Sequence, residues 1–567
     1  MATRPFRLAG AVLVIGGILA AQPVIADDKP TYRVGECAAP EGVPTFAQDY
    51  IDMTRAGGEP IIDTLPDGTL VWGSHAGTTH IYGAEAADEG SLPFLQNYNG
   101  QTYYYWSDDN GAEWHYVNRD PIRDQVDPER GLSGMPVSGF SDPDFAVDLA
   151  GNVFVSEINL ANIAVSRSDD GGRSYVLQSM VEITASDRQW MEADEEDVLY
   201  FVANTFGGGS ASSGNAVTGS TNNAFYKSVD GGVTFSAPQT IVSRQASSDI
   251  KIDRNTGAVY QLDTSAGNVL GLIKFPNARN EMPPAMTFEQ YEIALDYRSA
   301  SSIDPTLAID AEGNLYVTWA DKGSAMRDAG VYYTYSTDGG ETWLEEPIKV
   351  TEGDETAIWS WIYVGEPGKV AISWIETDRA LPDHEQENGT GPWHVWTAMT
   401  HTGLGCEGVE GGAGFVVTRA SGEAPHTGQI CSTGTTCEAR AVDRRLGDYF
   451  SHTVDADGNI VVAISDTNQG GAIALPLMIR QIDGPTVGRG SAVPYDCDGE
   501  TLADYPGKPD VTDEDATAAC ADSEGADQSD ASSASPSDNG DSDGRAFQGA
   551  PVASDAWLRL MLAALAG

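Results

Sequence analysis

The chain has 567 residues and a formal net charge of −52, from 84 Asp and Glu against 32 Lys and Arg. Such a surface repels polyanions, which makes DNA or RNA an unsuitable partner. Hydrophobic residues make up 41% of the chain, enough for a large core, and the 63 Gly and 29 Pro favour an all-β fold with tight turns over a helical one.

Residues 1–26 have the features of a signal peptide. Arg4 and Arg7 precede an apolar stretch over 8–21, and Ala26 offers a small residue at the cleavage position. The apolar stretch is too short for a comfortable membrane span. We therefore expect a secreted or periplasmic protein without an integral membrane span.

The 6 cysteines form an even set, which permits disulfides in an exported chain. The sequence does not fix their pairing. We predict the pairs that close short loops, Cys431 with Cys437 and Cys497 with Cys520, which leaves Cys37 for Cys406. No C-x-x-C pair is present, so a zinc knuckle or thioredoxin-like role is disfavoured.

A Ser-x-Asp-x-Gly-x-x-aromatic pattern recurs along the chain. It is typical of a hairpin turn in which Asp accepts hydrogen bonds from turn amides and Gly supplies a positive φ. We therefore expect these acids to be structural. They are Asp109, Asp170, Asp230 and Asp338.

A second pattern, an extended segment followed by a turn and a β-rich strand, interleaves with the first. It is clear at 142–156 and 304–319 and weaker at 60–74, 187–203, 247–263, 357–376 and 447–466. The spacing implies that one turn pattern has been lost near residue 280. Repeats built from two hairpins predict a β-propeller. Seven blades are favoured, with six as the alternative if the first and last copies merge.

The predicted organisation has one large domain. An N-terminal extension precedes it, and a small acidic cap tied by a disulfide, a disordered acidic linker and a short apolar helix follow it. The boundaries are 27–54 for the extension, 55–493 for the propeller, 494–520 for the cap, 521–545 for the linker and 546–567 for the helix.

The turn pattern resembles the Asp-box, or BNR repeat, of the sialidase superfamily, over roughly residues 55–485. The resemblance implies an Asp-box β-propeller. It says less about activity, because the superfamily includes sialidases, other glycosidases, polysaccharide lyases and proteins without catalysis.

In propellers, the loops that lead into the innermost strands share one face with the loops between second and third strands. Carboxylates that converge there either raise one another's pKa or bind a cation, for which calcium is the candidate. The alternative is that each Asp only caps its own strand. The candidates at these positions are Asp142, Asp187, Arg188, Asp249, Asp304, Trp359, Trp361, Asp448 and Tyr449, with Asp249 and Asp304 as metal ligands.

Longer loops on the same face add substrate-binding candidates, namely Arg327, Arg379 and His384. The aromatic residues Trp359 and Trp361 could stack on sugars. A metal role for His75 with His80 is a weaker hypothesis, because their spacing fits no standard ligand pattern.

A sialidase would need three arginines on a substrate carboxylate, a Tyr nucleophile with a Glu base, and an Asp acid/base. The family's Arg-Ile-Pro or Arg-Leu-Pro motif before the first box has no counterpart here. Arg188, Arg444 and Arg445 are candidates for the clamp. The nucleophile candidate is Tyr449 with Glu376 or Glu157.

These patterns favour an exported, glycan-directed hydrolase of the sialidase-like type, with its site at the channel mouth. It would act as a monomer on a glycan or polysaccharide and require no cofactor. A non-catalytic propeller that binds glycan, peptide or calcium is the first alternative, and a polysaccharide lyase is the second.

Overall fold

The computed structural model describes thirteen ranges of the chain between residues 31 and 489. The described ranges are 31–75, 102–117, 141–159, 162–181, 186–205, 222–242, 249–301, 305–381, 384–385, 391–409, 411–431, 442–469 and 473–489. All their regular structure is β, and they contain no helix that could cross a membrane. The all-β prediction is confirmed.

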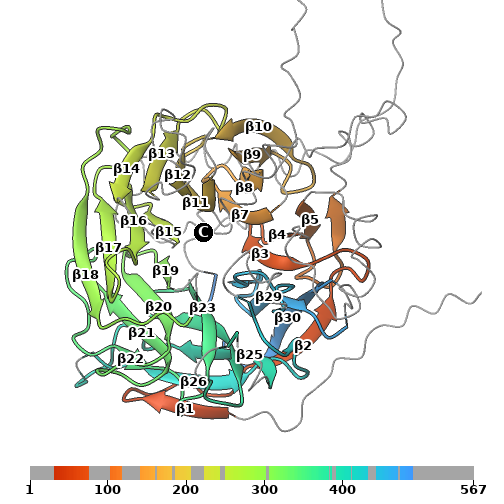
Figure 1. The fold of residues 1–567 in the computed structure, drawn as a ribbon, viewed down its shortest axis with the longest axis vertical. Helices are drawn as coiled ribbons and strands as arrows, with labels where there is room; N and C mark the ends of the chain where they lie inside the picture. Colours follow the sequence, from red (N-terminus) through yellow and green to blue (C-terminus); the bar gives the residue numbers. More distant parts are fainter. Residues whose placement is uncertain are drawn as a thin grey trace, which may run out of the picture.

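The strands form seven antiparallel sheets around a central axis (Figure 1), which confirms a seven-bladed β-propeller. Blade 1 contains β3 (Gly58–Thr64), β4 (Leu70–His75), β5 (Thr102–Ser107) and β6 (His115–Val117). Blade 2 contains β7 (Ser141–Val147), β8 (Val153–Asn159), β9 (Asn162–Ser168) and β10 (Val176–Val181). Blade 3 contains β11 (Ser186–Ala193), β12 (Leu199–Thr205), β13 (Asn222–Ser228) and β14 (Gln239–Val242).

The remaining blades complete the ring in chain order. Blade 4 contains β15 (Ile250–Asp253), β16 (Ala258–Asp263), β17 (Val269–Phe275) and β18 (Glu289–Leu295), and blade 5 contains β19 (Thr306–Ile309), β20 (Leu315–Asp321), β21 (Gly330–Ser336) and β22 (Ile348–Lys349). Blade 6 contains β1 (Thr31–Gly35), β23 (Ala357–Val364), β24 (Val370–Thr377), β25 (Pro392–Thr400), β26 (Gly414–Arg419) and β27 (His426–Thr427). Blade 7 contains β2 (Thr45–Tyr50), β28 (Ser451–Val454), β29 (Ile460–Asp466) and β30 (Leu475–Asp483).

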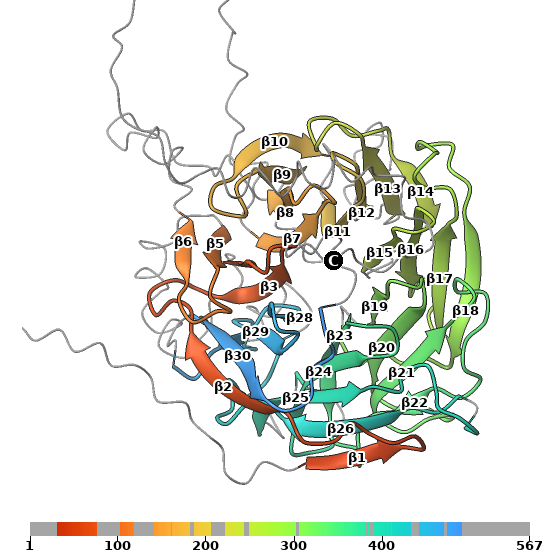
Figure 2. The ribbon, with the colours of Figure 1, turned by 180° about the vertical axis from the view of Figure 1, so that it is seen from behind.

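The innermost strands β3, β7, β11, β15, β19, β23 and β28 surround the axis, and each contacts the next around the ring (Figure 2). The hydrophobic core lies mainly between neighbouring blades. For example, Phe154 of blade 2 packs in one cluster with Phe201 and Tyr226 of blade 3. The starts of all innermost strands therefore meet at one end of the central channel.

The N-terminal segment closes the ring. Strand β2 pairs with β30 as the outermost strand of blade 7, and β1 pairs with β26 at the edge of blade 6. Residues 31–50, which the sequence prediction placed in an extension before the propeller, thus supply two strands. Each of these two blades combines strands from both ends of the described chain.

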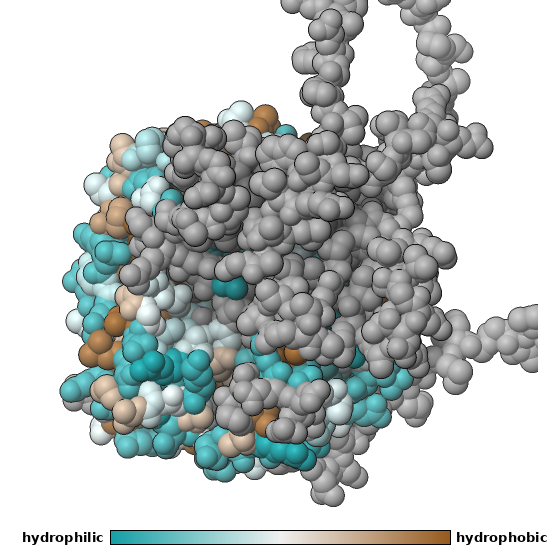
Figure 3. Space-filling model, viewed as in Figure 1, coloured by the Kyte–Doolittle hydropathy of each residue, from teal (hydrophilic) through white to brown (hydrophobic). Residues whose placement is uncertain are grey.

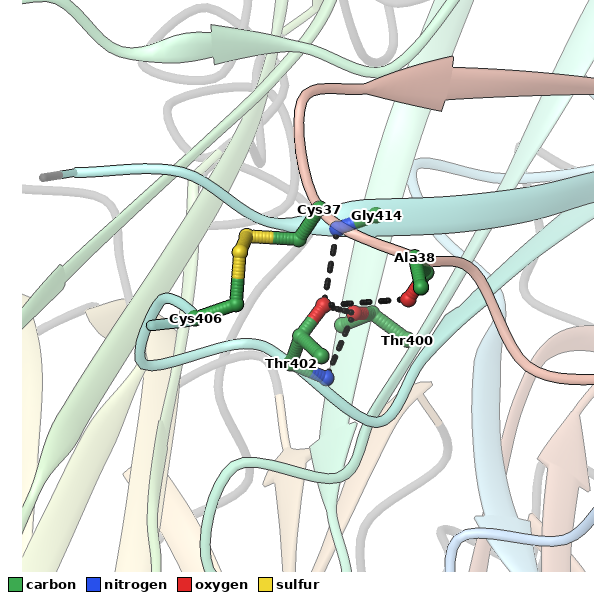
Figure 4. Close-up of a disulfide and its surroundings, with 6 residues drawn as sticks. All are labelled: Cys37, Ala38, Thr400, Thr402, Cys406 and Gly414. Atoms are coloured by element: carbon green, nitrogen blue, oxygen red, sulfur yellow. Dashed lines mark hydrogen bonds between the residues drawn. A yellow bond between two sulfur atoms is a disulfide. The ribbon is translucent and has the colours of Figure 1, made fainter. Parts of the chain in front are cut away.

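A disulfide fixes this closing segment. Cys37, between β1 and β2, is bonded to Cys406, which lies after β25 (Figure 4). The backbone N–H of Gly414 donates to Thr402 Oγ1 beside it at 3.0 Å. The predicted pair is confirmed. Cys431 is also disulfide-bonded, while Cys437, Cys497 and Cys520 lie outside the described residues, so their pairings stay predictions.

The Asp-box turns join the third and fourth strands of blades 1, 2, 3 and 5. In the second box, Gly172 N–H donates to Ser168 Oγ at 2.9 Å and Ser174 N–H donates to Asp170 Oδ1 at 2.8 Å. Partial burial opposes ionisation of Asp170, but hydrogen bonds from Ser174 and Ser168 outweigh it and lower the pKa of the carboxyl. The boxes hold the turns, as predicted. Blade 4 has no box between β17 and β18, where the spacing placed the missing copy.

The surface on the side seen in Figure 1 is mostly hydrophilic where the structure describes it. Hydrophobic areas there are small and scattered (Figure 3). This view shows no broad apolar patch of the kind that marks a large protein interface. It agrees with the acidic composition.

Removal of the closing disulfide should destabilise the propeller. Substitution of both cysteines, Cys37→Ser and Cys406→Ser, removes a disulfide between residues 369 positions apart in the sequence. We expect the free energy of unfolding to fall by about 2–5 kcal/mol. Denaturant unfolding of the variant and the wild type measures this loss. The substitutions are preferable to a reductant, which would also reduce the disulfide of Cys431. An unchanged unfolding midpoint would show that the disulfide does not contribute to the stability of the β1 and β2 pairing.

Candidate functional site

Four innermost strands share one backbone distortion at their start. In β3, β7, β11 and β23 the register against the next strand shifts by one extra residue, between Gly58 and Ile61 in β3 and at the matching positions in the others. A bulge of this kind redirects side chains. In each bulge one residue other than glycine has a left-handed φ: Glu59 (46°), Asp142 (50°), Arg188 (53°) and Trp359 (56°).

A cluster of interacting polar side chains lies at the channel mouth, with Glu59 at its centre. Its members are Glu59, His75, Asp142, Glu157, Asp187, Arg188, Arg444 and Asp448. Glu59 Oε2 is 2.6 Å from His75 Nε2, and its Oε1 accepts a hydrogen bond from Asp448 N–H at 2.8 Å. Its carboxyl group also hydrogen-bonds the carboxyl group of Asp142. A Cβ on Gly447 would come within 2.1 Å of Glu59 Cγ, so only glycine fits beside this side chain.

A buried arginine balances part of the negative charge. Arg444 Nη2 donates to Asp448 Oδ2 at 2.8 Å, and Nη1 donates to the other carboxylate oxygen. The same Nη2 lies 3.5 Å from Glu59 Oε1. Such a two-point pair is strong and directional. The Arg444 charge is therefore compensated within the protein.

The cluster shifts the pKa of its members. Burial raises the pKa of Glu59 to about 7, and Asp448 adds to the rise while Arg444 opposes it. Burial, then Glu59 and Asp187, raise the pKa of Asp142 well above its ordinary value. Burial lowers the pKa of His75 to about 4, so its imidazole is neutral at pH 7.

The acidic residues of the cluster differ in their exposure. Asp142 and Asp187 are both partly exposed, whereas Glu59, Glu157 and Asp448 are buried. Burial raises the pKa of Asp187, and the neighbouring Arg188 opposes the rise. Asp142 and Asp187 are therefore the most accessible acidic residues of this cluster.

Three aromatic rings pack below the cluster. The ring centroid of Trp190 is 6.2 Å from that of Trp361 and 5.8 Å from that of Tyr449. The Tyr449 hydroxyl donates to the Pro143 carbonyl at 2.8 Å, and the side chain is only 3% exposed. Burial raises its pKa well above the ordinary value. This geometry favours a packing role for Tyr449 over the nucleophile role that the sequence suggested.

Several predicted site residues have partners outside the cluster or are buried. Asp249 is 3.2 Å from the Lys251 ammonium, which is also 2.6 Å from Glu192. Trp359 is buried, and Glu376 accepts a hydrogen bond from Trp374 in blade 6. Asp304 and His80 lie outside the described residues.

The other predicted arginines pair with acids of their own. Arg445 lies 2.5 Å from Asp443, Arg379 lies 3.5 Å from Asp378, and Arg327 lies 3.6 Å from Asp321. The His384 carbonyl accepts a hydrogen bond from Ile430 N–H. In the described ranges, the only predicted clamp arginines in the cluster are thus Arg188 and Arg444.

Glu59 is not among the site residues predicted from the sequence, and His75 is predicted there only as a weaker metal ligand. Glu59-Pro60 repeats the acid-proline pair of Asp142-Pro143 and Asp304-Pro305, which is a usable signal. The first copy of the second pattern, predicted at 60–74, begins one residue after Glu59. His75 had no such signal, because its importance comes from its position opposite Gly58 across the strand pair.

One group of side chains in the described part of the chain could hold a metal ion. The potential ligand atoms of Glu59, His75 and Asp142 all lie within 4.8 Å of one another. One imidazole nitrogen and two carboxylate groups form a mixed donor set.

No protein-family model and no curated protein matches the chain. Among solved structures, it is similar to the intramolecular trans-sialidase from Ruminococcus gnavus, with 16% identity and a TM-score of 0.35 over 79% of this chain and 99% of that one. It is also similar to the α-L-arabinanase from Penicillium chrysogenum, with 12% identity and a TM-score of 0.35 over 78% and 99%.

A third similar structure is YCF48 from Cyanidioschyzon merolae, with 10% identity and a TM-score of 0.39 over 76% of this chain and 98% of that one. The Asp-box propeller fold of this chain is established by its own strand order and box hydrogen bonds.

Glu376 should make the stability depend on pH. Burial raises its pKa to about 8, although the hydrogen bond from Trp374 opposes the rise. Since the folded chain holds this proton more tightly than the unfolded chain, the associated stability is complete at low pH and is lost as pH rises through about 8. Thermal unfolding at pH 6 and pH 9, in high salt to screen general repulsion, should show a smaller loss for Glu376→Gln than for the wild type.

The exposed Glu345→Gln is the matched control and should behave like the wild type. If Glu376→Gln and the wild type lost equal stability between the two pH values, the assignment of this titration to Glu376 would be wrong.

Proposed function

We propose that the protein is a glycan-directed hydrolase whose site is the channel mouth. The observation that carries the proposal is the pair Asp142 and Asp187, two partly exposed carboxyl groups from neighbouring blades that couple electrostatically. Two carboxyl groups that flank a bond are the usual equipment for glycoside hydrolysis.

The reaction needs only these two groups and water. One carboxyl group donates a proton to the leaving oxygen as the glycosidic C–O bond breaks, and the other takes a proton from the water that bonds to the sugar carbon. Trp361, partly exposed beside Trp190, offers an apolar ring face to a sugar.

Local charge favours a neutral glycan over a sialoside. Arg444 is bound to Asp448, and Arg445, Arg379 and Arg327 have acidic partners of their own. Arg188 lies beside the mouth, where its charge already acts on the neighbouring Asp187. An anionic sugar would meet Asp142, Asp187 and the buried acids behind them with little compensation.

Asn in place of either acid should abolish turnover. We expect Asp142→Asn and Asp187→Asn each to lower kcat on a neutral reporter glycoside by about 100-fold or more. The exposed Asp378→Asn should keep wild-type activity. Initial rates over a panel of neutral and sialic acid glycosides measure both the loss and the preference.

Three results would contradict this proposal. Binding of a glycan without turnover would support the non-catalytic alternative. Sialoside release that disappears in Arg188→Ala would restore the sialidase hypothesis. Uronate cleavage that leaves an unsaturated product would support a lyase.

A further inference from the structure

We propose that Glu59, His75 and Asp142 form a binding site for a divalent transition-metal ion such as Zn²⁺. Their potential ligand atoms lie within 4.8 Å of one another. Glu59 lies in the bulge of β3, His75 is the last residue of β4, and Asp142 lies in the bulge of β7. Three strands from two adjacent blades therefore aim their side chains at one point.

The backbone holds these donors in place. Gly58, next to Glu59, pairs directly with His75 in the β3–β4 register, and both Glu59 and His75 have 0% exposure. Side chains fixed by strand pairing and burial need little reorganisation to bind an ion. The left-handed φ of Glu59 and of Asp142 is the kind of backbone strain that often marks functional sites.

Groups behind the donors orient them. Glu59 Oε1 accepts the Asp448 N–H at 2.8 Å and faces Arg444 at 3.5 Å, which leaves Oε2 on the side of His75. Ser141 Oγ donates to Asp142 Oδ1. Partners of this kind commonly support metal ligands. The Arg444 charge does not stand unpaired against an ion, because Asp448 binds it at two points.

The donor types select the ion. One imidazole nitrogen with two carboxylates suits Zn²⁺ and similar ions, whereas Ca²⁺ prefers an all-oxygen shell with more ligands. Two carboxylates also match the charge of a divalent ion. This site therefore differs in place and in chemistry from the calcium site that the sequence suggested at Asp249 and Asp304.

The chain supplies three donors to this site. Glu59 and His75 are buried, and Asp142 is partly exposed. Three protein ligands are the number typical of catalytic zinc sites, which keep a further position for water, whereas structural zinc sites have four. Metal binding itself does not depend on the proposed hydrolase function. The two-carboxyl reaction proposed above is that of the metal-free chain, because Asp142 cannot act as an acid or base while it binds an ion.

Calorimetric titration of the chelator-treated full chain with ZnCl₂ tests the site. We expect one equivalent of Zn²⁺ to bind. Substitution of a residue that only supports a metal ligand typically lowers metal affinity by roughly 10- to 100-fold, and we expect His75→Gln, which removes a ligand, to lower it by more. His115→Gln is the matched control, because His115 stacks on Trp106 away from the mouth. Its affinity should equal that of the wild type.

A spectroscopic measurement on the wild type tests the site without relying on the folding of any variant. Co²⁺ added to the wild type should give visible absorption bands that equimolar Zn²⁺ removes. No binding by the wild type, equal binding by His75→Gln and His115→Gln, or one-to-one Ca²⁺ binding that excludes Zn²⁺ would overturn the proposal. Zinc binding together with no turnover by the metal-free chain would leave the site standing and remove the hydrolase, and turnover in a chain that binds no zinc would do the reverse.

Discussion

The candidate site depends on a bulge at the start of the innermost strands. In a regular strand, neighbouring side chains alternate between the two faces of the sheet. Without the bulge, the direction of an acid at the strand start would therefore follow from this alternation alone. The extra residue and its left-handed φ set Glu59, Asp142 and Arg188 in another direction. Such a conformation costs about 1–3 kcal/mol per residue other than glycine. The packed ring of blades stabilises the bulges, and the bulges in turn gather the charged groups.

Charge compensation is the second condition for this arrangement. Carboxyl groups outnumber cations at the mouth, as they do in the whole chain with its charge of −52. Arg444 bridges Asp448 and Glu59 in the buried layer, while Asp142 and Asp187 are partly exposed. The buried layer thus shapes the electrostatic environment of the two accessible acids. Whether the mouth holds a proton or a metal ion, the same surplus of negative charge attracts it.

Much of the fold could be predicted because it repeats. The Asp boxes fix the turns through local hydrogen bonds, so Asp109 and its three counterparts could be found without tertiary information. Repetition also located Asp142, Asp187 and Asp448, because propeller topology places the starts of the innermost strands together. The pairing of Cys37 with Cys406 followed by elimination once the short loops were assigned.

The rest depends on contacts that sequence patterns do not contain. The burial of Tyr449 comes from its hydrogen bond to Pro143 in another blade. Asp249 is matched by Lys251, a partner that no repeat indicated. Strands β1 and β2 join the last two blades through pairing across nearly the whole described chain. These features arise when the ring closes, and a linear repeat analysis does not represent that step.

The most direct test of the site is a crystal structure determined from crystals soaked in a neutral oligosaccharide. We expect difference density at the channel mouth, with a sugar ring against Trp361 and a glycosidic oxygen within hydrogen-bond distance of Asp142 or Asp187. Density confined to the outer blade edges, or a mouth that stays free of sugar at saturating concentration, would contradict the central claim that the bulged strand starts form the functional site.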